Sequence, residues 1–274
     1  MRRTRKRLLQ LGIILLCLIV IIVISLVFFK KEKKDDQTQT AVIQVKKEKK
    51  KKSQHKLEQT VPTVESNGSS YLKMDGDRVI EKNWAQLELI KNYPVNKDFA
   101  IGSMKLHLNT IKLIKLDHIK KEAKNLLNDY TASSFNTLIK EGVEFENIGE
   151  LYDAQSKSMW TIGNEVYYLE VNYTITNHYD KEVQFFSFVT LQYGDLLFDD
   201  VPFSNFNISE DTLMGSSAVS RIDYPSGQSR EGKIALLLKD KPPLSNKFIF
   251  TTDDILDGVT HELIDNKQTI QIKL

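Results

Sequence analysis

Apolar and polar residues alternate along much of the second half of the chain, which is the pattern of half-buried β-strands. In the segment VYYLEVNYTIT, Leu169 and Val171 fall on one face of an extended chain, and Glu170 falls on the other. The same alternation returns in the run 183–191, after the polar segment NHYDK. We therefore expect these two runs to form an antiparallel hairpin.

Several other segments show a comparable pattern and predict further strands. They are residues 104–116, 232–239 and 246–251, followed by a closing pair over 261–274 with a turn near Asp265 and Asn266. Short strands separated by turn signals favour an all-β sandwich or barrel. The pattern therefore predicts a mainly β domain, which we place at residues 84–274.

One part of this domain changes from the period of a strand to the period of a helix. Its apolar residues at helical spacing are Ile119, Ala123, Leu126 and Leu127. Asp117 has the residue type of a helix N-cap, and a second short helix is expected after Ser134 and ends at Gly142. We expect a helical insertion at about 117–142, whose simplest role is to cap one end of the β-sandwich.

Residues 8–29 form an apolar run of 22 residues near the start of the chain. As a helix the run would measure about 33 Å, enough to cross a hydrocarbon core of about 30 Å. It is longer than the apolar core of a secretory signal, and no small-residue cleavage site follows it. Cys17 lies in its middle and not at a lipoprotein processing position. We expect an uncleaved, single-pass membrane anchor in the lipid bilayer; the alternatives are a cleaved signal and a buried core helix.

Basic residues flank the apolar run on both sides, and we expect them to contact lipid headgroups or another anionic surface. They are Arg2, Arg3, Arg5, Lys6 and Arg7 before the run, and Lys30, Lys31, Lys33 and Lys34 after it. Five basic residues precede the run and four follow it, so the bias that basic flanks give to the orientation is slight. Because the tail at 1–7 is short, we expect that tail in the cytoplasm and the C-terminal domain outside the cell.

Charge divides the chain into two parts of opposite sign. Residues 1–59 contain 16 basic and 5 acidic residues, which leaves residues 60–274 with 22 basic and 31 acidic residues.

We expect a flexible linker over 30–83, whose Lys-rich part has too few apolar residues to form a core. The linker either attracts anionic lipid or wall polymers or serves as a solvated spacer. Nucleic acid is not an expected partner, because no aromatic residues interleave with the lysines.

The residue patterns of common catalytic and metal sites do not occur in the sequence. Cys17, within the apolar run, is the single cysteine, so the β domain has no disulfide and no thiolate ligand. The five histidines form no H-x-x-x-H pair, and the chain contains no G-x-S-x-G, Walker or G-x-G-x-x-G motif. We therefore expect no catalytic residues, no cofactor and no metal.

One segment, FDDVPFSNF, mixes aromatic and acidic residues without alternation and is our candidate for an interaction loop. Its residues of interest are Phe198, Asp199, Asp200, Phe203 and Phe206. Exposed aromatic residues would suit a carbohydrate or protein ligand, whereas core packing is the simpler explanation for most aromatic residues of the chain.

Three stretches of the chain carry a resemblance to a known family. The first is Ile101-Gly102 with the strand MKLHLNTIKLIKL, the second is YYLEVNYTITN ending at Asn177, and the third is YPSGQSREGKIALLLKDKP with Pro225, Gly227 and Gly232. Together they resemble a family of secreted or membrane-tethered bacterial domains with a telokin-like, immunoglobulin-type sandwich. The family includes a mycobacterial secreted antigen and many surface proteins of Firmicutes. The resemblance covers residues 99–274 and implies an immunoglobulin-like extracellular domain whose loops hold any binding site, without catalytic residues.

These observations predict a membrane-anchored extracellular module of a Gram-positive bacterium that binds a protein or envelope component without catalysis. Two alternatives stay open. One is a structural subunit of an envelope-spanning secretion or conjugation machine, and the other is an enzyme that acts on the cell envelope.

Overall fold

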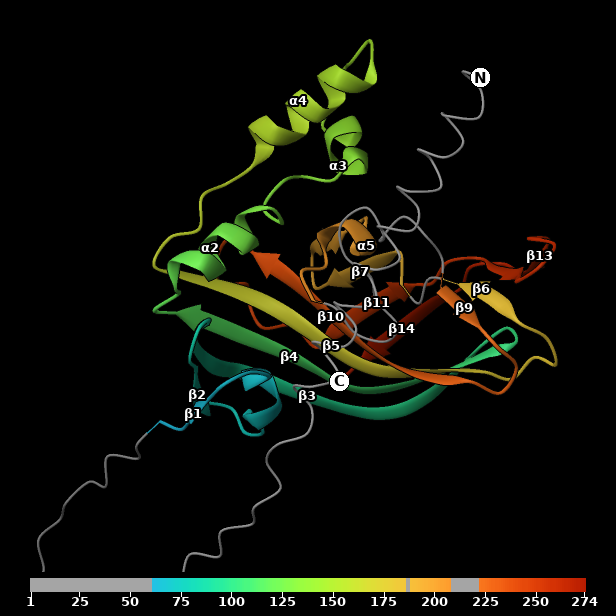
Figure 1. Ribbon diagram of the computed structural model, residues 1–274, viewed down its shortest axis with the longest axis horizontal. Helices are drawn as coiled ribbons and strands as arrows, with labels where there is room; N and C mark the ends of the chain where they lie inside the picture. The colour runs from blue at the N-terminus through green and yellow to red at the C-terminus, as the bar shows by residue number, and fades with distance from the viewer. Residues whose placement is uncertain (1–60, 186–187, 208–221) are drawn as a thin grey trace, which may run out of the picture. The chain divides into compact units, whose positions relative to one another are not determined.

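The computed structural model describes residues 61–185, 188–207 and 222–274 (Figure 1). Among these residues, no helix combines the length and apolar character that a membrane crossing requires. The expected anchor at 8–29, its basic flanks and the Lys-rich part of the linker lie outside the described residues, so they stay predictions.

The described residues form a six-stranded sheet and two four-stranded sheets, which confirms the prediction of a mainly β domain. The six-stranded sheet has the order β1-β2-β3-β4-β5-β10 and is antiparallel except between β1 and β2. Its strands are β1 (Thr63–Val64), β2 (Arg78–Glu81), β3 (Ala85–Ile101), β4 (Met104–Asp117), β5 (Glu165–Asn177) and β10 (Ser229–Leu238).

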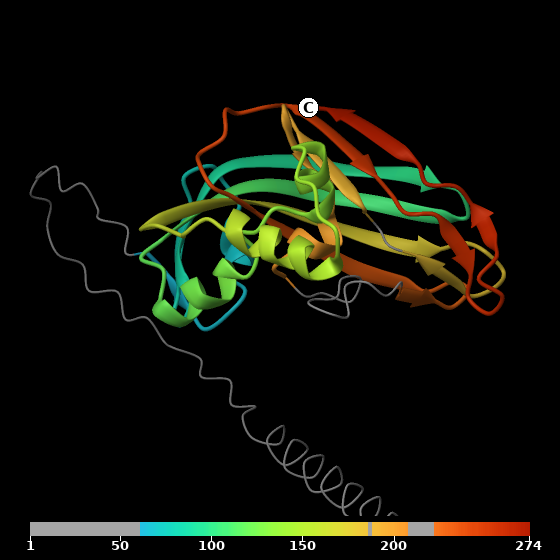
Figure 2. The same ribbon diagram turned by 90° about the horizontal axis from the view of Figure 1, so that it is seen from above.

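The two smaller sheets pack against one face of the six-stranded sheet (Figure 2). One has the order β14-β11-β7-β8 and the other has the order β13-β12-β6-β9. Their strands are β6 (Val183–Phe185), β7 (Thr190–Tyr193), β8 (Leu196–Phe198), β9 (Ile222–Tyr224), β11 (Lys247–Thr251), β12 (Ile255–Asp257), β13 (Leu263–Asp265) and β14 (Thr269–Lys273). Leu113, Phe185 and Phe250 come from the three sheets and are fully buried in one shared core. This layered arrangement is consistent with a β-sandwich.

A β-bulge in β4 changes which residues of that strand point to each face of the six-stranded sheet. The register of β4 against β5 shifts between Leu108 and Thr110. Leu108 faces the main core before the bulge, and Ile111 and Leu113 face it afterwards, whereas Ile114 belongs to a second cluster on the opposite face. The extra residue turns odd-numbered positions toward the main core after the bulge. The run IKLIKL has apolar residues at both odd and even positions, so it contributes to both clusters.

The predicted helical insertion is present between β4 and β5, and it extends beyond 117–142. The helices of the described residues are the 3-10 helix η1 (Gly68–Tyr71), α2 (Lys121–Asn128), α3 (Phe135–Lys140), α4 (Ile148–Ser158) and α5 (Val201–Ser204). Ser134 caps α3 as expected, because its side chain accepts a hydrogen bond from the Thr137 N–H at 3.1 Å. Asp117 does not cap α2; it is the last residue of β4, and Lys120 is the N-cap.

The second hydrophobic cluster lies between the six-stranded sheet and the elements that cover its other face. Leu72 follows η1, and Ala123 and Leu127 lie on α2. All three pack in one cluster with sheet residues such as Leu87. The helical insertion therefore buries part of a sheet face in addition to capping the domain.

The expected hairpin of 166–176 with 183–191 is wrong. Both edges of β5 are already paired, one with β4 and the other with β10. β6 pairs instead with β9 and β12 in a smaller sheet. The period of two correctly predicts the buried face of a strand, but it carries no information about the strand that lies beside it.

The expected closing pair over 261–274 is also wrong. β13 and β14 are both present, yet they lie in different sheets, where β13 pairs with β12 and β14 pairs with β11. The turn near Asp265 therefore moves the chain from one sheet to another. Asp265 holds this crossing in place, because its carboxylate accepts a hydrogen bond from the Ser103 N–H at 2.7 Å.

The folded part begins before residue 84, so the end of the expected linker needs a correction. Residues 63–81 contain β1, η1 and β2, and they extend the edge of the six-stranded sheet. Leu72 and Val79 from this segment are fully buried. A few apolar residues in a polar segment are enough to order it here, because an existing sheet edge supplies the hydrogen-bond partners.

Candidate functional site

The candidate site lies where the second face of the six-stranded sheet changes from apolar to polar. Along β5, Tyr168, Glu170 and Asn172 alternate on this face. Lys112 of β4 and Lys233 of β10 lie on the two neighbouring strands, because Lys112 pairs with Glu170 and Lys233 pairs with Asn172 in the sheet register. Charged residues in the middle of central strands are unusual and need compensation inside the fold.

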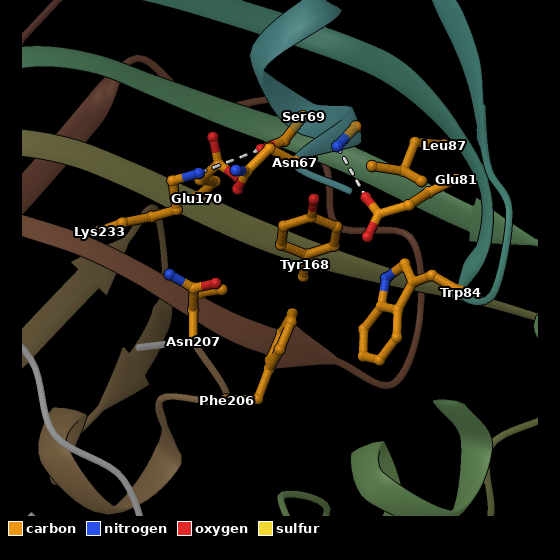
Figure 3. Close-up of a pocket in the computed structure, with 12 residues that line it drawn as sticks. Asn67, Ser69, Glu81, Trp84, Leu87, Tyr168, Glu170, Phe206, Asn207 and Lys233 are labelled. Atoms are coloured by element: carbon orange, nitrogen blue, oxygen red, sulfur yellow. Dashed lines mark hydrogen bonds between the residues drawn. The ribbon is translucent and has the colours of Figure 1, made fainter. Parts of the chain in front are cut away.

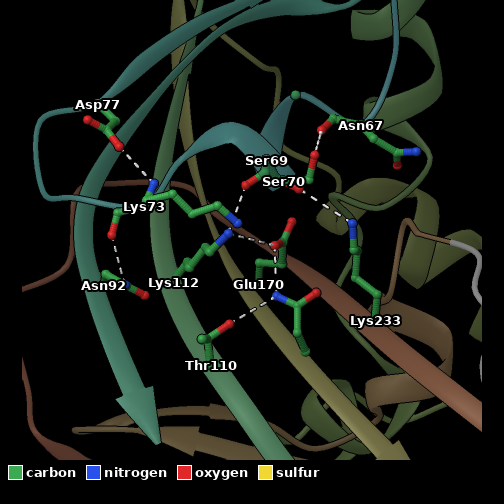
Figure 4. Close-up of polar contacts among 12 residues, drawn as sticks. Asn67, Ser69, Ser70, Lys73, Asp77, Asn92, Thr110, Lys112, Glu170 and Lys233 are labelled. Carbon is green, nitrogen blue, oxygen red and sulfur yellow. Dashed lines mark hydrogen bonds and ion pairs between the residues drawn. The ribbon is translucent and has the colours of Figure 1, made fainter. Parts of the chain in front are cut away.

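A buried ion pair forms the base of the site (Figure 4). Lys112 Nζ lies 3.8 Å from Glu170 Oε1, and both side chains are buried. Lys112 Nζ also donates a hydrogen bond to the carbonyl oxygen of Ser69 at 2.7 Å. Glu170 Oε1 accepts a hydrogen bond from Asn172 Nδ2 at 2.9 Å. The pair therefore connects the sheet to η1, which lies over it.

The charge state of Lys112 depends on opposing effects. Burial lowers the pKa of its ammonium, and the nearby Glu170 carboxylate raises it. Lys73 and Lys233 lower the pKa further through repulsion, and the net direction is downward. The ammonium is thus held in place by Glu170 and by the Ser69 carbonyl against a substantial desolvation cost.

Beside the ion pair lies a cavity of about 200 Å³, bounded by η1, the turn before β3, β5, β10 and the segment after α5 (Figure 3). Its polar lining includes Asn67, Ser69, Glu81, Glu170, Asn207 and Lys233, and its aromatic lining includes Trp84, Tyr168 and Phe206. The cavity therefore combines apolar ring surfaces with hydrogen-bonding groups of both charge signs.

Tyr168 lies centrally in this cavity, between Glu81 and Lys233 in the view of Figure 3. The residue is only 4% exposed, and its hydroxyl forms no hydrogen bond with any of the described residues. Burial raises the pKa of this hydroxyl well above its ordinary value, and the Glu170 and Glu81 carboxylates raise it further. Tyr168 is therefore a neutral phenol at physiological pH, able both to donate and to accept a hydrogen bond.

The rim above Tyr168 is shaped by the start of η1. Asn67 adopts a left-handed conformation with φ of 55°, and the following Gly68 donates its N–H to Glu81 Oε2 at 2.7 Å. A Cβ on Gly68 would lie 2.9 Å from that same carboxylate oxygen and 3.3 Å from Leu87 and Val79. The rim can approach the sheet this closely only because glycine occupies the position.

The aromatic wall is positioned by a short segment that runs along β10. Asn205 Oδ1 accepts the Ala235 N–H at 2.8 Å, and the Phe206 N–H donates to the Ala235 carbonyl at 3.1 Å. The Phe206 ring then stacks on Trp84 with centroids 6.4 Å apart and meets Tyr168 edge-on at 5.3 Å. These contacts place all three rings within one wall of the cavity.

The structure brings only one member of the predicted interaction loop to this cavity, namely Phe206. Phe198 ends β8, and Asp200 caps α5 by accepting the Phe203 N–H at 3.2 Å. Phe203 stacks on Phe135 of α3 with centroids 6.3 Å apart. These residues contact other parts of the chain, and whether they also bind a partner stays a prediction.

Asp199 of the same loop holds the helical insertion. Its carboxylate accepts hydrogen bonds from Ser134 Oγ, Thr137 Oγ1 and Lys140 Nζ, all on α3 or its cap. Burial would raise the pKa of Asp199, but the hydrogen bonds from Ser134, Lys140 and Thr137 outweigh it, and the pKa is lowered. The carboxylate is therefore ionised and links α3 to the segment before α5.

Sequence reasoning missed most of the cavity. Its residues come from four separate segments, at 67–69, 81–87, 168–170 and 233–235, besides Phe206 and Asn207. The available signal was the presence of Lys112 and Glu170 inside strongly apolar strands, where a charge requires a partner.

Among the described residues, no three His, Cys, Asp or Glu side chains converge as a metal site would require.

Comparisons with known proteins give little about this chain. It matches no protein-family model, and no curated protein matches it. A solved structure of a functionally unknown protein from Listeria monocytogenes EGD-e is similar at 13% sequence identity and a TM-score of 0.39. The match covers 69% of this chain and 86% of that chain.

Proposed function

We propose that the protein is a membrane-anchored, extracellular binding module without catalytic activity, and that the cavity over Tyr168 is its ligand site. The observation that carries the proposal is the Tyr168 hydroxyl, which lines a cavity and has no hydrogen-bond partner among the described residues. A hydroxyl that opens onto a cavity and is bonded to none of the described residues can exchange its bond to water for a bond to a ligand, at a net gain of about 0.5–1.5 kcal/mol. A polar ligand in the cavity would therefore find a hydrogen-bonding group that the fold does not use.

The charged groups around the cavity favour binding over proton transfer. Lys112 and Glu170 are buried and bonded to each other, to Ser69 and to Asn172. Glu81 uses one carboxylate oxygen to hold Gly68. Groups that are fixed in this way provide a rigid, pre-shaped surface, which lowers the entropy cost of binding a ligand.

The remaining parts of the proposal concern the placement of this module. We propose an immunoglobulin-like β-sandwich, which the facing antiparallel sheets support. The apolar run at 8–29 supports a single-pass anchor, and the Lys-rich segment after it supports a tether close to anionic lipid or wall polymers. The short basic tail at 1–7 supports an orientation with the folded domain outside the cell.

The orientation can be tested by protease shaving of intact cells of the bacterium that produces the protein. We expect released peptides from residues 61–274 and none from residues 1–7. Protection of 61–274 until the cells are lysed, in cells whose known surface proteins are released, would overturn the extracellular placement.

The binding role can be tested with the full-length protein in detergent micelles and purified peptidoglycan sacculi that retain their attached wall polymers. We expect the protein to sediment with the sacculi, and Tyr168→Phe to reduce the bound fraction several-fold. Tyr152→Phe is the matched control, because it removes a hydroxyl from a tyrosine of α4 that is 55% exposed and outside the cavity. Absence of binding, or equal binding by both variants, would contradict the proposal.

A further inference from the structure

We infer that the cavity over Tyr168 binds one pyranose ring of a saccharide, an inference that rests on the binding function proposed above. The cavity is polar on one side and aromatic on the other, is small, and contains hydrogen-bonding groups that the described part of the chain leaves unused. Together these properties match a puckered ring that has an apolar face and an edge of hydroxyl groups.

The cavity offers ring surfaces on one side and polar groups on the other. Trp84, Tyr168 and Phe206 form the aromatic wall, and Glu81 and Asn67 lie among the polar residues opposite (Figure 3). A purely apolar ligand would leave the polar groups desolvated and unpaired, at a cost in affinity. The occupant therefore has both an apolar face and polar substituents.

The charges around the cavity disfavour a strongly charged ligand. Glu81 and Glu170 are acidic, whereas Lys233 lines the cavity and Lys112 lies directly behind Glu170. A phosphate would meet two carboxylates, and a quaternary ammonium would meet Lys233 with Lys112 behind the Glu170 carboxylate, so neither gains a large net Coulomb attraction. The near balance of charge favours a neutral, polar ligand.

The arrangement of the rings disfavours a flat aromatic ligand. Trp84 and Phe206 are in direct contact at 6.4 Å between centroids, and Phe206 meets Tyr168 edge-on at 5.3 Å. Rings at these distances touch each other, which leaves no slot for a planar base to insert between two of them. A saccharide needs only one exposed ring face for its C–H groups.

Three side chains around the cavity have unused hydrogen-bonding capacity within the described part of the chain. Tyr168 has a free hydroxyl, Glu81 has one oxygen that accepts no hydrogen bond, and the Asn67 side-chain amide makes none. A phenol, a carboxylate and an amide together provide donors and acceptors, and each hydroxyl of a sugar can act as both. A volume of about 200 Å³ lies below the roughly 300–1,000 Å³ of sites for drug-sized ligands, so it suits a single ring.

The inference is tested by titrating full-length protein in micelles with methyl glycosides of glucose, galactose and N-acetylglucosamine. The Trp160→Phe background leaves Trp84 as the tryptophan that reports on the cavity, because the chain has two tryptophans. We expect a saturable change in Trp84 fluorescence with at least one glycoside. Tyr168→Phe and Glu81→Gln each weaken that binding about tenfold through the loss of a hydrogen bond, and Tyr152→Phe leaves it unchanged.

Glycerol phosphate and tetramethylammonium serve as anionic and cationic probes in the same assay. Saturable binding of either one, with no response to any glycoside, would overturn the saccharide assignment. If the glycosides fail but Tyr168 still controls binding to sacculi, the ligand class is wrong and the proposed function stands. If binding to sacculi is also lost or independent of Tyr168, both proposals fall. Matching thermal melts of all variants would show that lost binding does not come from unfolding.

Discussion

Replacing Lys112 by methionine is expected to destabilise the folded domain by about 3–5 kcal/mol, because it leaves the Glu170 carboxylate buried without its counter-charge. Both side chains are buried, and their charged atoms are 3.8 Å apart. At an effective dielectric constant of about 20, this distance corresponds to an attraction of about 4 kcal/mol. Methionine keeps the apolar length of the lysine stem, so the lost charge dominates the effect.

The double variant Lys112→Met with Glu170→Leu separates the cost of an unpaired charge from the cost of lost packing. Removing both charges also removes both desolvation costs, so the double variant loses less stability than the sum of the single variants, by about 2–3 kcal/mol. A residual loss of about 0.5–1.5 kcal/mol is expected for each of the two hydrogen bonds removed. The Ser69 carbonyl still accepts the Leu72 N–H at 3.3 Å, and the Asn172 amide still donates to Thr110 Oγ1 at 3.4 Å.

The assay is urea unfolding of the full-length protein in micelles, followed by tryptophan fluorescence. Lys91→Met is the matched control, because Lys91 forms an exposed pair with Asp75 at 2.8 Å, and such surface pairs contribute about 0–1 kcal/mol. The reasoning is refuted if Lys112→Met costs no more than Lys91→Met, or if the two single changes at 112 and 170 prove additive.

Two further predictions use the same unfolding assay. Gly232→Ala should lower the free energy of unfolding by about 1–3 kcal/mol, because the buried Tyr173 ring occupies the space of the added methyl group. Gly163→Ala is the control and should be nearly neutral, because the added methyl group would meet nothing closer than 3.9 Å. An equal effect of the two changes would contradict this account. Asp199→Asn should cost about 1–3 kcal/mol at pH 7 through weakened hydrogen bonds. Since the pKa of Asp199 is lowered from 3.8, its extra stabilisation is present above about pH 4 and is lost as the pH falls through the lowered pKa. The Asp199→Asn deficit should therefore shrink in acid, and a deficit of constant size from pH 7 to pH 3 would show that the ionised carboxylate does not stabilise the fold.

Asn177 illustrates how far local sequence signals reach. Its position at the end of a strand could be predicted from the polar turn that follows. In the structure it is fully buried, and its side chain donates to the carbonyls of Lys181 and Tyr224 and accepts the Tyr179 N–H, each at 2.8 Å. The two nearby partners lie within reach of a local turn, whereas Tyr224 is brought there by the pairing of β6 with β9.

The pairing partners of a strand could not be predicted from the sequence either, because they come from distant parts of the chain. Alternation in 166–176 correctly indicated which residues of β5 face the core, since a strand exposes successive side chains to opposite faces. The neighbours of β5 are β4 and β10. β10 begins at Ser229, which pairs with Thr176 although the two residues are more than fifty positions apart in the chain. A loop of that length closes at little extra entropy, so packing and not proximity in sequence selects the partner.

By itself the sequence determined the mainly β class, the helical insertion and the buried face of the long strands, because each depends on a local period of side chains. It also contains the apolar run at 8–29, whose length is that of a membrane anchor. Only the tertiary structure decided the cavity, because Tyr168, Glu81 and Phe206 come from distant segments and meet through the order of strands in the sheet and the bond of Phe206 to β10. A binding site of this kind depends on how faces are stacked, and no local pattern encodes which faces meet.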